Sequence, residues 1–243
     1  MIQTDKTAIV VRYANYREND RMLTLFSPTH GLVEAVARGC RRPKSKLLSA
    51  SELFALGEYE LFEKNGRHTV TGFTLTENFY ALRSDWERLS VGVYLLSLCE
   101  AAVQPGQPAQ ELFMLLLHTL SRLTFTEQPW RPLLTGFLVH YAAIEGIRPR
   151  LRHCMTCGRA IGPEEPAWFD PREGGVQCGL HRAPSMPPIA PAERRFLEHC
   201  LSHGSADWTE RPGLSAPLPA MRAYVEQRLE QPVRVKLPTD SAD

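Results

Sequence analysis

Two short motifs near the middle of the chain, Cys154-x-x-Cys157 and Cys178-x-x-His181, constrain this sequence most. A gap of two residues lets a tight turn direct both side chains at one ion, and the second pair completes a tetrahedron. Because the chain fills all four positions, none is left open for a reactive water. The pattern therefore predicts structural Zn²⁺, held in a zinc ribbon or a similar small module.

Two features of this motif leave alternatives open. A CxxC pair alone is often a redox pair, and a fourth cysteine is a more usual zinc ligand than His181. His153 stands beside Cys154 and competes for the same role. We expect His181 to be the ligand, because His153 would crowd the first turn and leave Cys178 without a second partner.

The composition describes an ordinary globular chain. It has 243 residues, of which 43% are hydrophobic, and a formal net charge of +1. Three of its six cysteines belong to the metal motif and the other three are scattered, which is no disulfide framework and suits a reducing compartment. We find neither a signal peptide nor an apolar run long enough to span a membrane, so we expect a soluble cytoplasmic protein that does not bind membranes.

The first eighty residues alternate in the manner of β-strands. Tight turns separate the segments, and Asn65-Gly66 is a strong hairpin signal. The strands are expected at residues 7–13, 21–26, 32–37, 56–63 and 68–75. Five short strands in this length predict a small closed barrel, with an oligonucleotide-binding (OB) barrel as the leading candidate. An SH3-like barrel would give a similar pattern.

From residue 81 the hydrophobic pattern becomes helical. Helices are expected at residues 86–100, 111–125, 130–145, 192–202 and 220–229, followed by a short strand at 233–235 and a disordered polar end. The predicted fold is α+β, with an OB barrel followed by a helical domain that carries an inserted zinc module. The predicted domains are residues 1–80 (OB), 81–150 with 183–243 (helical) and 151–182 (zinc).

A basic run between the third and fourth predicted strands is the candidate DNA-binding site. Its cations are Arg38, Arg41, Arg42, Lys44 and Lys46, and the run contains no acid. On a barrel, such a loop can line the groove in which a phosphate backbone lies. The alternative is a solvated loop without a ligand. Four nearby aromatics could also contact bases, although we expect most of them to be core: Tyr13, Tyr16, Phe54 and Tyr59.

The usual signatures of enzymes are missing from this sequence. It contains no GxxxxGK[ST] loop, no GxSxG elbow and no His-x-Glu of the zinc deaminases. We therefore expect no catalytic residue. Two other hypotheses stay open: a protein-interaction adaptor, and a zinc hydrolase that uses Glu164 or Glu165 as its base.

Two segments of the N-terminal region carry a resemblance to a known family. They are Tyr16 to Phe26 (YRENDRMLTLF) and Ala37 to Leu47 (ARGCRRPKSKL). With the helices and the metal motif that follow, the whole chain resembles the bacterial RecO family of DNA repair proteins. The positions that match the two motifs are Glu18, Asp20, Arg21, Arg38, Gly39, Arg41, Arg42, Lys44 and Ser45. The family commonly has four cysteines in its metal knuckle, whereas this chain has His181 at the fourth position.

The resemblance implies a recombination mediator of the RecF pathway that acts at the bacterial nucleoid. Such proteins bind single- and double-stranded DNA and anneal complementary strands. They work with RecR to load RecA onto strands coated by single-stranded DNA-binding protein (SSB), and they bind the acidic C-terminal tail of SSB. The resemblance places the SSB-tail pocket in the helical domain without identifying its residues here.

Overall fold

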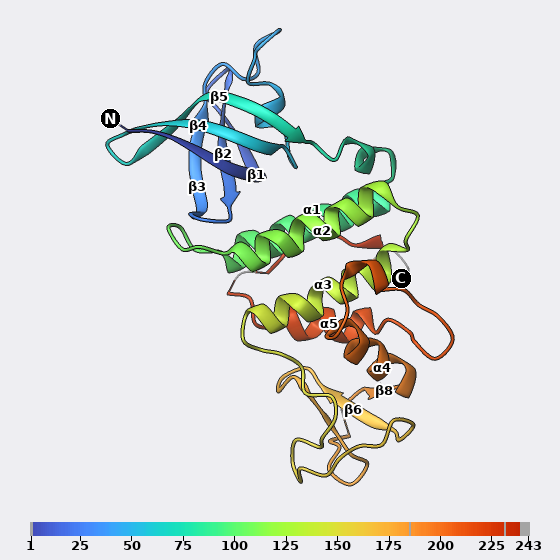
Figure 1. The fold of residues 1–243 in the computed structure, drawn as a ribbon. Helices are drawn as coiled ribbons and strands as arrows, with labels where there is room; N and C mark the ends of the chain where they lie inside the picture. Colours follow the sequence, from blue (N-terminus) through green and yellow to red (C-terminus); the bar gives the residue numbers. More distant parts are fainter. Residues whose placement is uncertain (1, 185, 231, 239–243) are drawn as a thin grey trace. The chain divides into compact units, whose positions relative to one another are not determined.

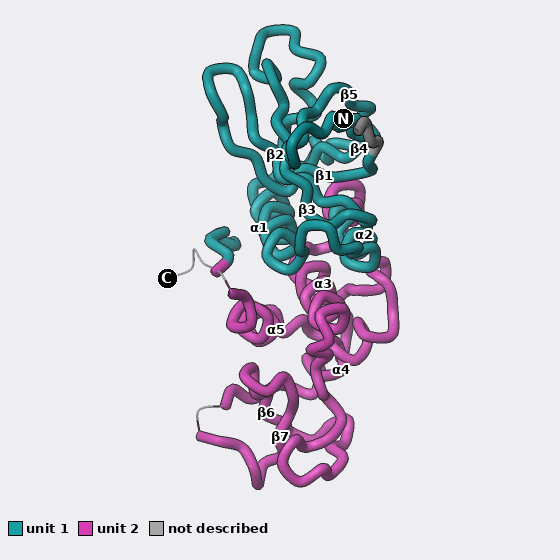
Figure 2. Tube along the Cα trace, turned by 90° about the vertical axis from the view of Figure 1, so that its left-hand side faces the viewer, with its two compact units in different colours: residues 1–120, 233–243 teal, residues 121–232 magenta. Residues whose placement is uncertain are grey.

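The structure, a computed structural model, describes residues 2–184, 186–230 and 232–238 (Figure 1). The chain forms two compact units, residues 1–120 with 233–243 and residues 121–232 (Figure 2). Among the described residues, no helix is long and apolar enough to cross a membrane. The finer division into barrel, helical domain and zinc module stays a prediction.

The first unit begins with five strands that close into a barrel. They are β1 (Ile2–Tyr16), β2 (Asp20–Ser27), β3 (Gly31–Ala37), β4 (Leu56–Lys64) and β5 (Arg67–Glu77). The strand order is β1-β2-β3-β5-β4; β1 closes the barrel by pairing with β4, and β3 runs parallel to β5. A five-stranded Greek-key barrel of this kind is an OB fold, so the leading prediction is confirmed.

Alternating side chains along β3 show how a strand of this barrel places one face in the core. Along β3, Val33, Ala35 and Ala37 are buried while Glu34 between them is exposed. Tyr59 of β4 is fully buried, and its hydroxyl donates to the carbonyls of Ala50 at 3.0 Å and Ala55 at 3.2 Å. The buried hydroxyl thus fastens the β3–β4 connection, which contains a 3-10 turn (Ser49–Ser51), to the barrel core.

A short 3-10 helix (Tyr80–Ser84) leads from the barrel into α1 (Trp86–Ala102). The carboxylate of Asp85 caps α1 by accepting from the amides of Glu87 at 2.9 Å and Arg88 at 3.2 Å. The next helix is α2 (Gln110–Phe125), and the boundary between the two units falls within it. Phe113 meets the ring of Phe26 edge-on at 5.2 Å, which holds the first half of α2 against the barrel strands.

In its described residues, the second unit contains the end of α2, three further helices and a small sheet. The helices are α3 (Trp130–Ile144), α4 (Pro191–Cys200) and α5 (Leu218–Glu226). The sheet has the order β7-β6-β8, formed by β6 (Ala167–Asp170), β7 (Gly175–Gln177) and β8 (Pro188–Ile189). A 3-10 turn (Ser205–Asp207) follows α4.

The sequence predicted these helices within a few residues but did not predict the sheet, whose strands are two to four residues long. Strands this short carry no readable alternation. The predicted strand at residues 233–235 is wrong, because these residues have no strand partner in the described structure. Most of the predicted disordered end, residues 239–243, lies outside the described residues.

Candidate metal centre and nucleic-acid interface

The first pair of proposed ligands lies on a tight turn. The amide of Gly158 donates to the carbonyl of Cys154 at 2.8 Å, and the amide of Cys154 donates to the carbonyl of Arg159 at 2.8 Å. Gly158 has a φ of +71°, a backbone conformation that glycine adopts without steric cost. The turn therefore reverses the chain and leaves both thiols of the CxxC pair on one side.

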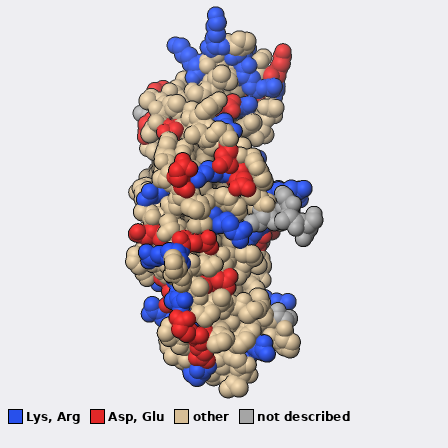
Figure 3. All heavy atoms as spheres, turned by 90° about the vertical axis from the view of Figure 1, so that its right-hand side faces the viewer, with Lys and Arg blue, Asp and Glu red and all other residues tan. Residues whose placement is uncertain are grey.

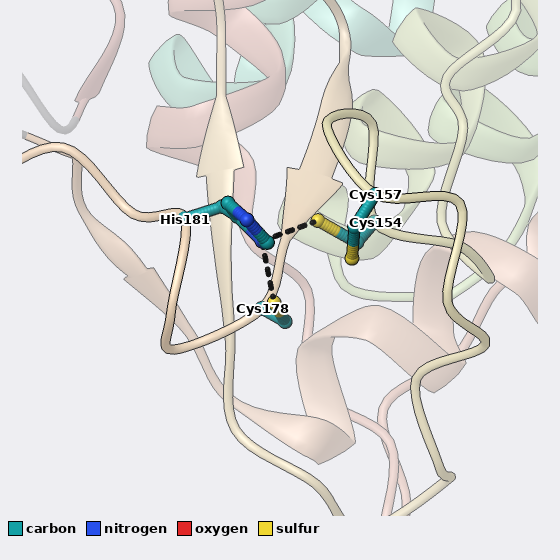
Figure 4. Close-up of side chains that lie close together, drawn as sticks. All are labelled: Cys154, Cys157, Cys178 and His181. Atoms are coloured by element: carbon teal, nitrogen blue, oxygen red, sulfur yellow. Dashed lines mark hydrogen bonds between the residues drawn. The ribbon is translucent and has the colours of Figure 1, made fainter.

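The second pair begins directly after β7. The amide of His181 donates to the carbonyl of Cys178 at 3.0 Å, which forms a second tight turn. The two turns face one another, so the ligand atoms of Cys154, Cys157, Cys178 and His181 all lie within 4.8 Å of one another (Figure 4). Nδ1 of His181 is 3.3 Å from Sγ of Cys178 and 3.9 Å from Sγ of Cys154.

These separations fit a tetrahedral zinc site. A sulfur and a nitrogen bound to one Zn²⁺ at tetrahedral angles lie about 3.6 Å apart. The four donors, three sulfurs and one imidazole nitrogen, are also the types that zinc prefers. This cluster can hold a metal ion, and it is the one such group found among the described residues.

The surroundings of the cluster favour thiolates at some positions. Burial opposes ionisation of the Cys178 thiol, but hydrogen bonds from the Leu180 amide and from the side chains of Cys154 and Arg159 lower its pKa to about 7. Burial likewise opposes ionisation of Cys154, while hydrogen bonds from neighbouring backbone amides lower its pKa. Because thiolate is the metal-binding form of cysteine, these contacts prepare both residues for a cation.

The structure brings His181, the histidine expected from the sequence, next to the three cysteines, and its role as a ligand stays a prediction. His153 is absent from the cluster, and its backbone instead pairs with Ala160. The carboxylates invoked by the hydrolase hypothesis are both engaged in ion pairs, Glu165 with Arg159 and Glu164 with Arg195. Neither is a free base, and four side-chain donors already surround the metal position.

Two side chains connect the metal-ligand region to the helices of the same unit. Arg194 of α4 is only 2% exposed, and its guanidinium donates to the carbonyls of Ile161, at 3.3 Å, and Gly162. Tyr224 of α5 donates from its hydroxyl to the carbonyl of Ile147 at 2.5 Å. The Tyr224 ring also packs edge-on against Phe169 of β6, with ring centroids 5.7 Å apart.

The basic run forms a chain of tight turns after β3. Backbone hydrogen bonds join Arg42 to Gly39 and Ser45 to Arg42, each at 3.1 Å. Cys40 is fully buried in the barrel core and Leu47 packs against that core, so both anchor the loop. The five cations predicted to bind DNA are all exposed: Arg38, Arg41, Arg42, Lys44 and Lys46.

These five cations are available to a ligand. None of them forms an ion pair within the described part of the chain, although the Arg41 guanidinium donates to the carbonyl of Glu18 at 3.1 Å. Figure 3 shows Lys and Arg side chains gathered at the top of the view, over the barrel unit. The assignment of the five as DNA-binding residues stays a prediction.

A hollow of about 380 Å³ lies on the barrel beside this loop. It lies over Met22 of β2 and Val36 of β3, and the turns at Arg17 and Gly66 flank it. The face of strands 2 and 3, with the β1–β2 and β4–β5 loops, is where OB folds bind oligonucleotides. Sequence reasoning missed the two arginines that line this hollow besides Arg38, namely Arg17 and Arg67. Its lining also includes His68, Asp20 and Glu34.

The four aromatics considered from the sequence divide into two pairs. Phe54 and Tyr59 are buried, whereas Tyr13 and Tyr16 are 38% and 39% exposed. Tyr16 lines the hollow. Tyr13 lies under the guanidinium of Arg21, whose carbon is 4.1 Å from the ring centroid. Of these four, only Tyr16 lines the hollow, and the guanidinium carbon of Arg17 lies over its ring, 5.2 Å from the centroid.

The fold and the two sites define a class: an OB-barrel protein with a helical unit that carries a Cys₃His cluster. Family models confirm the class. "Recombination protein O N terminal" matches residues 1–79, and "Recombination protein O C terminal" matches residues 83–237. The chain belongs to the RecO family of DNA repair and recombination proteins. This family consists of non-catalytic recombination mediators, so the expectation that the chain is not an enzyme is confirmed.

Curated relatives agree with the family models. The DNA repair protein RecO of Alkaliphilus metalliredigens is 35% identical over 179 residues, covering 73% of this chain and 71% of the relative. That of Anaeromyxobacter dehalogenans is 34% identical over 234 residues, covering 92% and 90%. That of Acetivibrio thermocellus is 31% identical over 155 residues, covering 64% of this chain and 62% of the relative.

Proposed function

We propose that this protein binds single- and double-stranded DNA and anneals complementary strands. It works with RecR to load RecA onto DNA coated by SSB, and it docks the acidic C-terminal tail of SSB. The observation that carries the DNA-binding part is the loop of five exposed cations beside the hollow of the barrel. The RecR, RecA and SSB parts rest on membership of the RecO family.

Annealing by this protein needs no covalent chemistry. Two complementary strands repel one another through their phosphates, and protein cations that neutralise those phosphates lower this repulsion. Arginine is suited to this because its planar guanidinium grips two phosphate oxygens at once. The exposed Arg38, Arg41 and Arg42 supply such groups from a loop whose backbone is held in place.

We also propose that the Cys₃His cluster binds structural Zn²⁺. The donor types and the separations of the ligand atoms support this assignment. When bound, the ion would join the CxxC turn to the turn after β7 and so stabilise the second unit. The exposed Cys157 and His181 leave one side of the site open to solvent, so chelators can reach it.

The DNA-binding proposal is tested with the double variant Arg41→Glu, Arg42→Glu in the full-length protein. Strand annealing of complementary oligonucleotides at low salt should slow at least tenfold. Five phosphate contacts on a single strand would give a log K against log[salt] slope of about −3.5. The variant should show a slope that is smaller in magnitude by about 1.4, because two of those contacts are lost.

A matched control keeps the charge change but moves it away from the loop. Arg172 and Arg211 are exposed arginines of the second unit, outside the metal cluster and the hollow. The double variant Arg172→Glu, Arg211→Glu should anneal DNA like the unmodified protein. Unchanged annealing by the loop variant would remove the loop from the mechanism, and absence of salt-dependent DNA binding by the unmodified protein would favour the adaptor hypothesis.

A further inference from the structure

A second basic segment lies in the second unit, just before the CxxC turn. Residues 148–153 read Arg-Pro-Arg-Leu-Arg-His and contain no acid. The arginines occupy alternate positions of an irregular segment that bends at Arg152. Arg148, Arg150 and Arg152 are exposed, whereas Pro149 and Leu151 between them are buried. The segment therefore presents three arginine side chains to solvent.

The backbone of this segment is held on both sides. The amide of Arg150 donates to the carbonyl of Gly174 at 2.8 Å, and the carbonyl of Arg150 accepts from the amide of Val176 at 3.0 Å. The carbonyl of Arg152 accepts from the amide of Ile161 at 2.9 Å. Main-chain hydrogen bonds therefore already hold the segment that carries the arginine row. Binding a ligand to it costs less conformational entropy than ordering a free loop would.

The arginine row lines a pocket of about 460 Å³. The other side of this pocket is formed by Glu198 of α4 and by Leu201 and Ser202 after it. Arg152 makes a 3.6 Å ion pair with Glu198 but keeps 74% of its side chain exposed. Within the described residues, Arg148 and Arg150 have no ion pair, so their charge is available to a ligand.

We infer that this arginine row is a second phosphate-binding site, which holds the backbone of a nucleic-acid single strand. The inference rests on the proposed function and extends it to the second unit. The three arginines stand at alternate positions of one held segment, so the row offers several cations to the same strand. A flexible single strand can fit successive phosphates to such a row, and each guanidinium can bind one of them in a bidentate manner.

The backbone pairing favours nucleic acid over an acidic peptide. A peptide commonly gains affinity by adding a strand to a free sheet edge. Here the amide and carbonyl of Arg150 and the carbonyl of Arg152 are already bonded within the unit. What remains for a partner is the row of charged side chains, and contact with phosphates requires nothing more.

The test uses full-length protein carrying Arg148→Glu and Arg150→Glu, with a fluorescent oligothymidine as the probe. Affinity at low salt should fall about tenfold or more, and the salt slope should shrink in magnitude by about 1.4, for two lost phosphate contacts. The variant Arg172→Glu, Arg211→Glu is again the charge control and should leave affinity and slope unchanged. Combining the pocket and loop substitutions should shrink the magnitude of the salt slope by about 2.8, for four lost phosphate contacts.

A second variant separates the loss of charge from any disruption of the fold by the glutamate substitutions. Arg148→Gln with Arg150→Gln removes the two charges without adding acids, and it should give the same change in slope with an unaltered thermal melt. Wild-type affinity and slope in a folded glutamine variant would overturn the inference while leaving the proposed function intact. Absence of DNA binding by the unmodified protein would instead overturn the proposed function.

A labelled poly-aspartate peptide distinguishes the competing ligand class. The inference requires the pocket variants to lose oligothymidine affinity. If they lose only affinity for the acidic peptide and keep the oligothymidine salt slope, the row is a peptide site and the inference is wrong.

Discussion

The carboxylate of Asp20 accepts a 2.7 Å hydrogen bond from the backbone amide of Gly39, nineteen residues further along the chain. The adjacent Asn19 carbonyl accepts from the amide of Arg41 at 3.1 Å. The two sequence segments that carry the family resemblance are therefore hydrogen-bonded to one another. The first segment, which includes Glu18 and Asp20, holds the backbone of the basic loop, and the second supplies the cations.

Asp20→Ala is expected to loosen the loop without removing any of its cations. Loss of a hydrogen bond to a charged acceptor should lower the free energy of unfolding by about 1.5 kcal/mol. Amide hydrogen exchange at Gly39 should accelerate, which NMR or mass spectrometry can measure. Asp20→Asn keeps an oxygen acceptor, so its free energy of unfolding should fall less than that of Asp20→Ala. Equal exchange rates at Gly39 in the unmodified protein and both variants would contradict this role of Asp20.

Elemental analysis of the purified protein should find one zinc per chain. Cys154→Ala should lose that zinc and lower the melting temperature, because a structural metal contributes directly to folding free energy. Cys99→Ala is the control: Cys99 is buried outside the cluster, so this variant should lose packing energy but keep its zinc. A zinc-free protein whose melting temperature is insensitive to chelators would exclude a structural zinc.

Gly136→Ala should destabilise the second unit by about 1–3 kcal/mol through overpacking. A Cβ at Gly136 of α3 would lie 2.3 Å from ring atoms of Trp208, which is 1% exposed. Gly204→Ala is the matched control, because Gly204 has a φ of −78° and nothing lies within 4 Å of its Cβ position. Urea denaturation measures the stability of both variants. Equal stability would show that the Trp208 ring moves aside for the new methyl group at little cost.

Alkaline pH should destabilise the protein partly through Cys200. Burial raises the pKa of this thiol. The folded state therefore keeps the proton at a pH at which the unfolded chain, with a thiol pKa of about 8.5, releases it. The contribution of Cys200 to stability is complete below that pH and decreases above it by up to about 1.4 kcal/mol per pH unit.

Cys200→Ala removes this titration, so its stability between pH 8 and 10 should fall less steeply than that of the unmodified protein. Urea denaturation at several pH values measures the two slopes, and the difference between them cancels the contributions of the other thiols and tyrosines. Parallel pH profiles would show that the Cys200 thiol titrates alike in the folded and unfolded states.

Local patterns were sufficient to predict several parts of this protein. Alternation along residues 32–37, the Asn65-Gly66 hairpin and the helical spacing from Trp86 onward each depend on neighbours in sequence, and the strands and helices appear where these signals stand. The metal motif was readable for the same reason. Two residues between ligands correspond to one tight turn, and the turns at Cys154 and Cys178 are present.

Other features depend on residues that are distant in sequence, and only the tertiary structure decided them. The choice of an OB barrel over an SH3-like one required the pairing of β1 with β4 and of β3 with β5. The hollow on the barrel joins Arg17 to Arg67, and the pocket of the second unit joins Arg150 to Glu198. The sequence determined which side chains are available, because residue type and local spacing are written in it directly. Which of them share a surface was decided by strand pairing and helix packing, because these bring together segments that have no relation along the chain.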